Sequence, residues 1–198
     1  MLAKARVSVG GAKHEWIEAD IAAWTPSQPV DVVYSNAALH WQGDHERLFP
    51  RIFGWVAPGG VLAVQMPDQF AAPSHVALAD VVVTTRWRDR LAGRAKPFAV
   101  LPIAGYFGLL TAAGAEVDAW TTEYLHVLRA ADDGVHPVVA WMKGTAMTPF
   151  LAALDADEER AFINDVSARV ASAYPPLADG RVLFPFRRIF LIASRAIR

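Results

Sequence analysis

The chain has 198 residues, of which 54% are hydrophobic and 20% are charged, and it contains no cysteine. A chain of this size and composition buries one substantial core, so we expect a single globular domain over residues 1–198 and exclude disorder. A formal net charge of −1 offers no basic surface for nucleic acid, and the lack of cysteine excludes disulfides and thiolate chemistry.

The apolar stretches indicate neither a membrane segment nor a secretory signal. The longest of them, such as "HVALADVVV", are interrupted by Asp or His well short of the roughly 18 to 20 residues that span a bilayer. The first residues, "MLAKARVSVGG", lack the long apolar stretch of a signal peptide. We therefore predict a cytoplasmic protein with no membrane and no nucleic-acid partner.

Short apolar runs alternate along the chain with longer segments of helical period. This alternation is typical of βαβ units and predicts an α/β fold with a largely parallel sheet. A turn-forming residue closes each apolar run. Five strands are predicted, at 14–19, 30–35, 61–66, 115–124 and 182–194.

Two of the predicted helices have recognisable ends. In the first, Asp44 is placed to cap an initial turn, Pro50 to begin the main helix and Gly59 to end it. In the second, Asp155 is followed three positions later by a glutamate, which is a capping-box pattern, and Pro175 is the stop. Apolar residues at every fourth position of this second segment predict an amphipathic surface helix.

The stretch "VDVVYSNAALHW", residues 30–41, is an apolar run that ends in a polar residue and an aromatic pair. A strand that is apolar on both faces is central in an α/β sheet, and ligands of such sheets bind at the carboxyl ends of the strands. Asn36 lies at that end and can both donate and accept, while the small Ala37 and Ala38 allow close approach of a ligand. Trp41 would form a wall or lid. The alternative is an ordinary strand-to-loop transition.

Asp20 follows the predicted strand at 14–19 in a similar way. Its carboxylate is suited to accept from an exocyclic amine such as that of adenine, with Ile21 against the face of the ring. The alternative is that Asp20 caps a helix that begins in "IAAW". Two strand ends that carry polar groups together favour a ligand site at this edge of the sheet.

Nine stretches, in order over nearly the whole chain, resemble the class I S-adenosylmethionine-dependent methyltransferases, and in particular the trans-aconitate methyltransferases, which esterify a small polycarboxylate. They are "MLAKAR", "EADI", "DVVYSNAALHW", "HERLFPRIF", "APGGVLAVQMPDQ", "GYFGLLTAAGAEVDAW", "YLHVL", "AWMKGT" and "FPFRRIFLIASR". The resemblance implies a Rossmann-like class I methyltransferase sheet with helices on both faces, S-adenosylmethionine as the cofactor, and methylation of a carboxylate of a small polycarboxylic acid such as trans-aconitate. It also implies that 67–113 and 126–178 form substrate-side helices and a cap.

By this resemblance the cofactor is bound by residues that follow the strands at 14–19 and 30–35, namely Asp20, Ile21, Asn36, Ala37, Leu39, His40 and Trp41. The first two look like contacts to the adenine. The next three look like contacts to the methionine end of the cofactor. The last two would border the methyl group that is transferred.

The family begins with a strand, a glycine-rich turn and a helix, followed by a second strand that ends in an acidic residue for the ribose. "MLAKAR" matches the helix after that second strand, so both strands are expected upstream of Met1. The chain has no G-x-G-x-G pattern, and "VGGAK" at 9–13 follows helix-like residues. In the family these two strands lie between those at 14–19 and 30–35. We therefore expect weak cofactor binding and little turnover from the chain alone, and self-association through exposed strand edges.

Esterification of a carboxylate is a displacement by a nucleophile that is already ionised at pH 7, so we expect positioning residues rather than a catalytic base or a metal ion. The candidates for binding the acceptor are Trp41, Tyr106, Tyr124, His126, Lys143 and Arg188. Arg188 matches an arginine of the family, and Arg86, Arg88 and Arg90 are placed to cover the site. The alternatives are solvated surface arginines and a core position for His126. Thr148 stands where relatives have an arginine, which removes one bidentate carboxylate partner.

Other enzyme classes have little support in the sequence. A G-x-S-x-G elbow and a Walker A loop are absent, and His40, Asp44 and His45 are spaced too loosely to predict a metal site. The alternative from a different class is a catalytically incompetent fragment or an interaction protein that pairs with another chain through a sheet edge.

Overall fold

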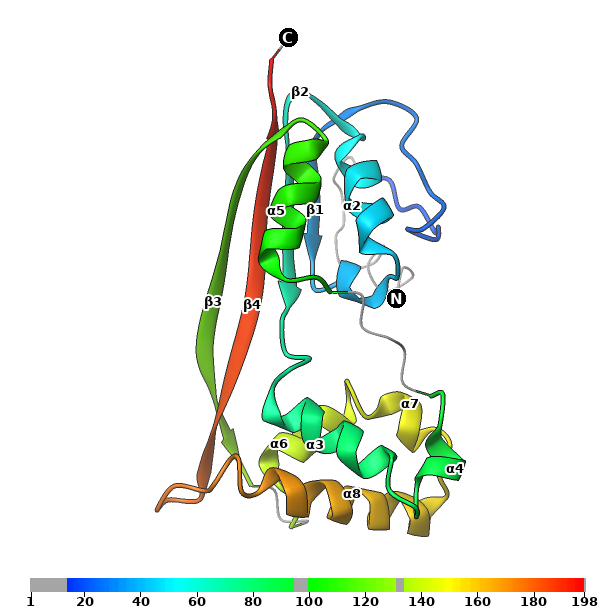
Figure 1. Ribbon diagram of the computed structural model, residues 1–198, viewed down its shortest axis with the longest axis vertical. Coiled ribbons are helices and arrows are strands. Elements are labelled where there is room, and N and C mark those ends of the chain that lie inside the picture. Colours follow the sequence, from blue (N-terminus) through cyan, green and yellow to red (C-terminus); the bar gives the residue numbers. More distant parts are fainter. Residues whose placement is uncertain (1–13, 95–99, 131–133, 198) are drawn as a thin grey trace.

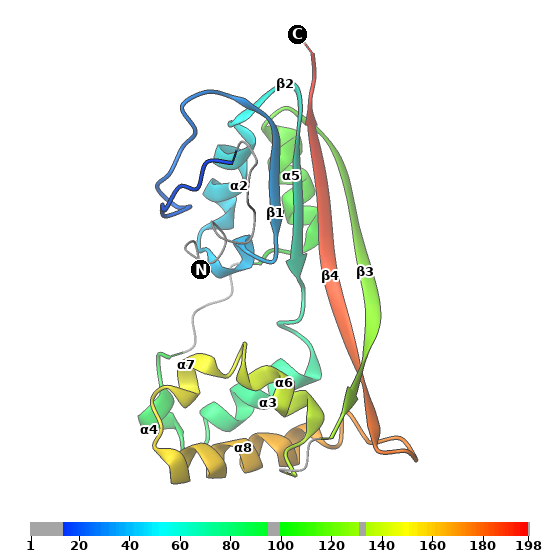
Figure 2. The same ribbon diagram turned by 180° about the vertical axis from the view of Figure 1, so that it is seen from behind.

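Four strands form one mixed sheet in the order β1-β2-β4-β3, in a computed structural model that describes residues 14–94, 100–130 and 134–197. The strands are β1 (Val30–Asn36), β2 (Val56–Pro67), β3 (Ala115–Arg129) and β4 (Arg181–Arg195). The helices are α2 (His45–Phe53), α3 (Pro73–Val82), α4 (Arg88–Leu91), α5 (Ile103–Ala112), α6 (Pro137–Lys143), α7 (Thr148–Leu151) and α8 (Ala156–Val170), with a 3-10 turn, η1 (Leu39–Trp41). Two helical groups lie at different levels along the long β3–β4 ribbon (Figures 1 and 2).

The prediction of a largely parallel sheet is wrong. Only β1 and β2 run parallel within the described sheet, with Val33 opposite Leu62. β4 is antiparallel to β2 and also to β3, and its pairing with β3 continues from Ala115–Arg195 to Arg129–Arg181 without a shift. An apolar run predicts that a segment is a strand, but strand direction depends on how the connections return, which the run does not encode.

Four of the five predicted strands are confirmed, and each is as long as or longer than predicted. The predicted strand at 14–19 is wrong, because residues 14–20 have no regular secondary structure. No strand of the described sheet lies outside β1 to pair with this segment. Most of its residues are exposed, so water can satisfy its backbone groups, which an unpaired buried strand would leave unsatisfied.

The predicted helix ends are partly correct. α2 begins after Asp44, but Pro50 lies inside it and the helix ends at Phe53, so the predicted stop at Gly59 is wrong. Gly59 has a φ of 78° and lies in β2. The capping box of α8 is confirmed, because Asp155 accepts from backbone N–H groups of the first turn and Glu158 bonds back to the Asp155 N–H.

The two helical groups cover opposite faces of the β3–β4 ribbon. In β4, Phe184 and Phe186 belong to a core with α3, α6 and α8, whereas Ile189 and Leu191 belong to a core with α2 and α5. Side chains alternate between faces along a strand, so this change from even to odd numbers means a change of face. Helices therefore lie on both faces of the ribbon, and the change occurs at Arg187 and Arg188.

We name α3, α4, α6, α7 and α8 the lower helical group, which lies beside the lower part of the β3–β4 ribbon in Figure 1. The sequence assigned 67–113 and 126–178 to substrate-side helices and a cap, and that role for the lower helical group stays a prediction. α5 falls within the first range but packs on the sheet with α2. No helix in the described part of the chain is long and apolar enough to cross a membrane.

Candidate active site at the carboxyl ends of β1 and β2

The guanidinium of Arg188 lies at the point where β4 changes the face that it buries. Its Nε donates to the Tyr124 hydroxyl at 2.8 Å, and one terminal nitrogen donates to Gln65 Oε1 at 3.1 Å. The guanidinium carbon also lies 4.7 Å from the centre of the Phe186 ring. Gln65 pairs with Asn36 in the sheet, so this arginine is held beside the carboxyl ends of β1 and β2. The structure thus brings together Arg188 and Tyr124, two of the residues that the sequence proposed as contacts to the acceptor.

One buried hydrogen-bond donor beside Arg188 lacks an acceptor. Gln65 is only 7% exposed, and its Nε2 has no partner although its Oε1 accepts from Arg188. The Tyr124 oxygen accepts from Arg188, which leaves the phenolic proton available to donate. Arg188 forms no ion pair with any carboxylate that the structure describes. A buried donor without an acceptor is costly, and the Gln65 amide next to the Arg188 cation fits an anion such as a carboxylate.

Two neutral histidines surround this cation. Burial, with smaller contributions from the neighbouring His45 and from the positive charge of Arg188, lowers the pKa of His40 to about 4. Burial and the charge of Arg188 also lower the pKa of His126, whose ring lies 5.0 Å from that of Tyr124. His40 Nδ1 and His126 Nε2 are buried without partners. The arrangement therefore combines one fixed cation with neutral polar groups.

The turn after β1 places His40 and Trp41. Ala37 has a φ of 49°, a left-handed conformation that costs free energy for a residue other than glycine, and its N–H donates to the Gln65 carbonyl at 3.0 Å. Leu39 is buried, and the rings of His40 and Trp41 lie 4.6 Å apart. Trp41 is 56% exposed, so this ring is free to cover a ligand at the strand ends.

Tyr106, which the sequence proposed as a contact to the acceptor, is fully buried in the core between α2 and α5. Its hydroxyl lies 2.6 Å from His45 Nδ1 and accepts from the Leu101 N–H at 3.0 Å. His45 Nε2 donates to the Leu39 carbonyl at 3.0 Å, so Nδ1 must accept from the tyrosine. The structure does not bring Tyr106 to Arg188. Instead, Tyr106 and His45 hold η1, and the sequence reasoning gave His45 no such role.

A groove of about 550 Å³ runs along β1 and is lined by Ile21, Asn36 and Leu39, three of the predicted cofactor contacts. Ser35 also lines it, and its buried Oγ has no partner. An apolar wall with the Asn36 amide, the Ser35 and Tyr34 hydroxyls and the Glu15 carboxylate fits an adenosyl group. Asp20 is not among the lining residues, and its Oδ1 accepts from the Ala22 N–H at 2.9 Å, in line with the capping alternative.

The remaining candidate cations lie in or next to the lower helical group, and three of the four form ion pairs with α8. Lys143 lies 3.9 Å from Glu159, Arg86 lies 3.3 Å from Asp165, and Arg90 lies 3.1 Å from Glu158. Arg88 is paired with the neighbouring Asp89. These contacts favour the alternative of surface charges, and they do not bring the four side chains to Arg188. Thr148 donates to the Lys143 carbonyl at the start of α7.

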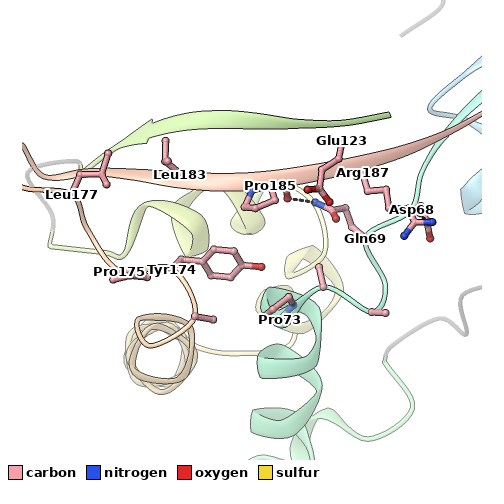
Figure 3. A pocket seen from close by; sticks show the side chains of 13 residues that line it. Asp68, Gln69, Pro73, Glu123, Tyr174, Pro175, Leu177, Leu183, Pro185 and Arg187 are labelled. Carbon is pink, nitrogen blue, oxygen red and sulfur yellow. Dashed lines mark hydrogen bonds and ion pairs between the residues drawn. The ribbon is translucent and has the colours of Figure 1, made fainter. Parts of the chain in front are cut away.

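Arg187 and Arg188 face opposite sides of the β3–β4 ribbon. Arg187 pairs with Asp68 at 3.0 Å, beside a second cavity of about 520 Å³ (Figure 3). In the same cavity Gln69 donates to the Pro185 carbonyl at 2.8 Å, which occupies part of the free edge of β4. Two adjacent arginines thus have different partners: Arg187 is paired with a carboxylate, whereas Arg188 is held by Tyr124 and Gln65.

Comparison with known proteins first defines the class. A crystal structure named as a methyltransferase from Bacillus halodurans C-125 has a TM-score of 0.54 at 13% identity, covering 98% of this chain and 77% of that one. At this identity the likeness shows the fold alone. Residues 1–64 match the family model described as a methyltransferase domain. The fold and the matched segment are those of a methyltransferase.

The sequence relatives define the family more closely. The trans-aconitate 2-methyltransferase of Methylobacterium nodulans is 43% identical over 196 residues, which are 98% of this chain and 74% of the relative. The trans-aconitate 2-methyltransferase of an Azoarcus species is 41% identical over 182 residues, which are 91% of this chain and 69% of the relative. The chain therefore belongs to the trans-aconitate 2-methyltransferase family, within the class I S-adenosylmethionine-dependent methyltransferases.

Proposed function

We propose that this chain is an S-adenosylmethionine-dependent O-methyltransferase that esterifies a carboxylate of trans-aconitate or a closely related small polycarboxylic acid. Family membership supports the reaction class and the cofactor. One observation carries the assignment to a carboxylate acceptor: Arg188 is fixed by Tyr124 and Gln65, and the Gln65 Nε2 beside it is buried without an acceptor. We also propose that the protein acts in the cytoplasm.

The residues of the site act by binding and orientation. The positive charge of Arg188 favours the ionised form of a bound carboxylate, which is the nucleophilic form. S-adenosylmethionine, when bound, supplies an electrophilic sulfonium methyl group. Because the acceptor has no proton to lose, the site needs no general base, and the lowered pKa values of His40 and His126 make these imidazoles weak bases. Hydrogen bonds from Gln65 and Tyr124 would hold one carboxylate oxygen in a fixed direction.

The groove along β1 would hold the cofactor beside this acceptor site. Asn36 connects the two, because it lines the groove and also pairs with Gln65 in the sheet. Ile21 supplies the apolar wall, and the small side chain of Ala38 leaves room at the strand end. Methyl transfer requires the two ligands to approach in line, and neighbouring strand ends supply that proximity.

The test is to incubate the chain with S-adenosylmethionine and trans-aconitate and to search for the monomethyl ester by mass spectrometry. Calorimetry with trans-aconitate, and with its trimethyl ester as a matched acceptor without carboxylates, tests binding separately from turnover. We expect the free acid to bind and the trimethyl ester not to bind. Equal binding of both compounds, or methylation of an amine in place of the acid, would refute the proposed acceptor class.

A further inference from the structure

The lower part of the β3–β4 ribbon has one covered face and one bare face. Residues of β4 with even numbers, such as Phe184 and Phe186, pack under the lower helical group. Residues with odd numbers point to the other face, which α2 and α5 cover only from Ile189 upward. Figure 1 shows helices of the described chain along only one side of this part of the ribbon. The odd-numbered face is therefore left to water or to a partner.

The bare face is apolar at its centre, although the watered face of an antiparallel sheet usually carries polar side chains. Leu125 and Val127 are each 52% exposed, and Leu183, which lies opposite Val127 in the sheet, is 37% exposed. Pro185 lies opposite Leu125 and completes a group of apolar side chains. We name Leu125, Val127, Leu183 and Pro185 the ribbon patch. Apolar groups gathered in this way on a surface favour contact with another molecule.

Two charges of opposite sign flank the ribbon patch on β3. Glu123 lies at one end and Arg129 at the other, both exposed and both on the face of the patch. Neither forms an ion pair with any residue that the structure describes. The arginines that flank the patch on β4, Arg181 and Arg187, are each paired with a nearby aspartate. Along β3 the bare face thus reads negative, apolar, apolar, positive.

We propose that the ribbon patch is the interface of a homodimer, in which two copies pack face to face about a two-fold axis level with His126. In this arrangement β3 of one copy runs antiparallel over β3 of the other, as the nearly aligned strands of packed sheets allow. Leu125 of each copy then lies over Val127 of the other. Glu123 of each copy lies over Arg129 of the other, so each unpaired charge gains a partner of opposite sign. An interface that uses the same patch on both copies closes at the dimer.

The ribbon patch is separate from the acceptor site and from the groove along β1. Arg188 and Tyr124 have even numbers and point to the opposite face of the ribbon. The groove lies at the other edge of the sheet, beyond β2 and β4. The dimer therefore leaves both ligand sites open. The patch is small beside standard interfaces of about 20 to 30 residues a side, so we expect a weak dimer that dissociates in the micromolar range or above.

Charge reversal at the two ends of the patch tests both the dimer and its register. In E123R two arginines meet at each end of the interface, and in R129E two carboxylates meet there. We expect each variant to raise the dimer dissociation constant about ten-fold or more, with partial recovery in about 1 M salt. An equimolar mixture of the two variants, and the double variant E123R/R129E, restore opposite charges at both ends. Both should return to within about three-fold of the wild type.

Sedimentation velocity from about 1 to 500 µM measures each dissociation constant, and circular dichroism verifies that the variants retain the fold. E116R is the matched control, because it reverses a carboxylate on β3 outside the patch, and it should stay within about three-fold of the wild type. A wild-type chain that stays monomeric over this range overturns the proposal. A dimer that the single reversals leave unchanged, or that their mixture does not restore, also overturns it. None of these readouts depends on cofactor binding or methyl transfer.

Discussion

Replacing Arg188 by methionine should weaken binding of trans-aconitate while leaving the fold intact. The substitution retains most of the length and apolar area of the side chain but removes the cation that Tyr124 and Gln65 hold in place. A charge-assisted hydrogen bond contributes about 1.5 to 3 kcal/mol, which corresponds to a rise in the dissociation constant of about 10- to 150-fold. Isothermal titration calorimetry of the chain with trans-aconitate measures this change directly.

Arg187→Met is the matched control, because it makes the same chemical change one position away. Arg187 pairs with Asp68 on the opposite face of the ribbon, so its loss should change acceptor binding less than about three-fold. Affinity for S-adenosylhomocysteine should stay the same in both variants. The reasoning is refuted if Arg187→Met weakens the acceptor as much as Arg188→Met, or if Arg188→Met weakens both ligands equally.

Three further outcomes are expected. Tyr106→Phe should lower the free energy of unfolding, measured in urea, by about 1 to 3 kcal/mol, because it leaves the Leu101 N–H without its partner. Tyr34→Phe, at an exposed ring, should change this free energy little. Equal effects of the two substitutions would contradict the buried hydrogen bonds of Tyr106. The pKa of His40 is lowered from about 6.5 to about 4, so between these pH values the unfolded state binds more protons than the folded state, and the free energy of unfolding should fall as the pH is lowered from 6.5 to 4. His40→Gln should make this dependence on pH shallower in urea titrations. An unchanged dependence would count against a neutral buried His40. Asp20→Ala should leave the affinities for S-adenosylmethionine and S-adenosylhomocysteine within about three-fold in calorimetry, because Asp20 lies outside the groove and accepts from the Ala22 N–H; a loss of about 1 to 2 kcal/mol for both would instead support an adenine contact.

The sequence by itself determined the local elements of this protein. Apolar runs bounded by turn residues located β1, β2, β3 and β4, because burial and backbone pairing both require such runs. The capping box at Asp155 located the start of α8, because it satisfies backbone N–H groups from within one turn. The end of the strand at Asn36 was also readable, and the relatives confirm the methyltransferase family to which the matching motifs pointed.

Some site residues carried a signal that was readable in sequence but not used. Gln65 is a single polar residue in the apolar run "VLAVQM", and a polar group within a buried strand needs a partner or a ligand. His45 stands near the start of a predicted helix, where nothing local connects it to Tyr106, 61 positions away. A pattern shows that such a residue requires an explanation, but the pattern does not identify its partner.

Only the tertiary structure decided how these elements meet. The directions of β3 and β4, the lack of a strand next to 14–19 in the described sheet and the position of Tyr106 in the core all depend on contacts between segments far apart in the chain. Arg187 and Arg188 are equivalent by composition, and the sheet alone places one against Asp68 and the other among Tyr124 and Gln65. The physical reason is that periodicity and capping act within a few residues, whereas strand order, the choice of buried face and the partner of a charge are set by long-range packing.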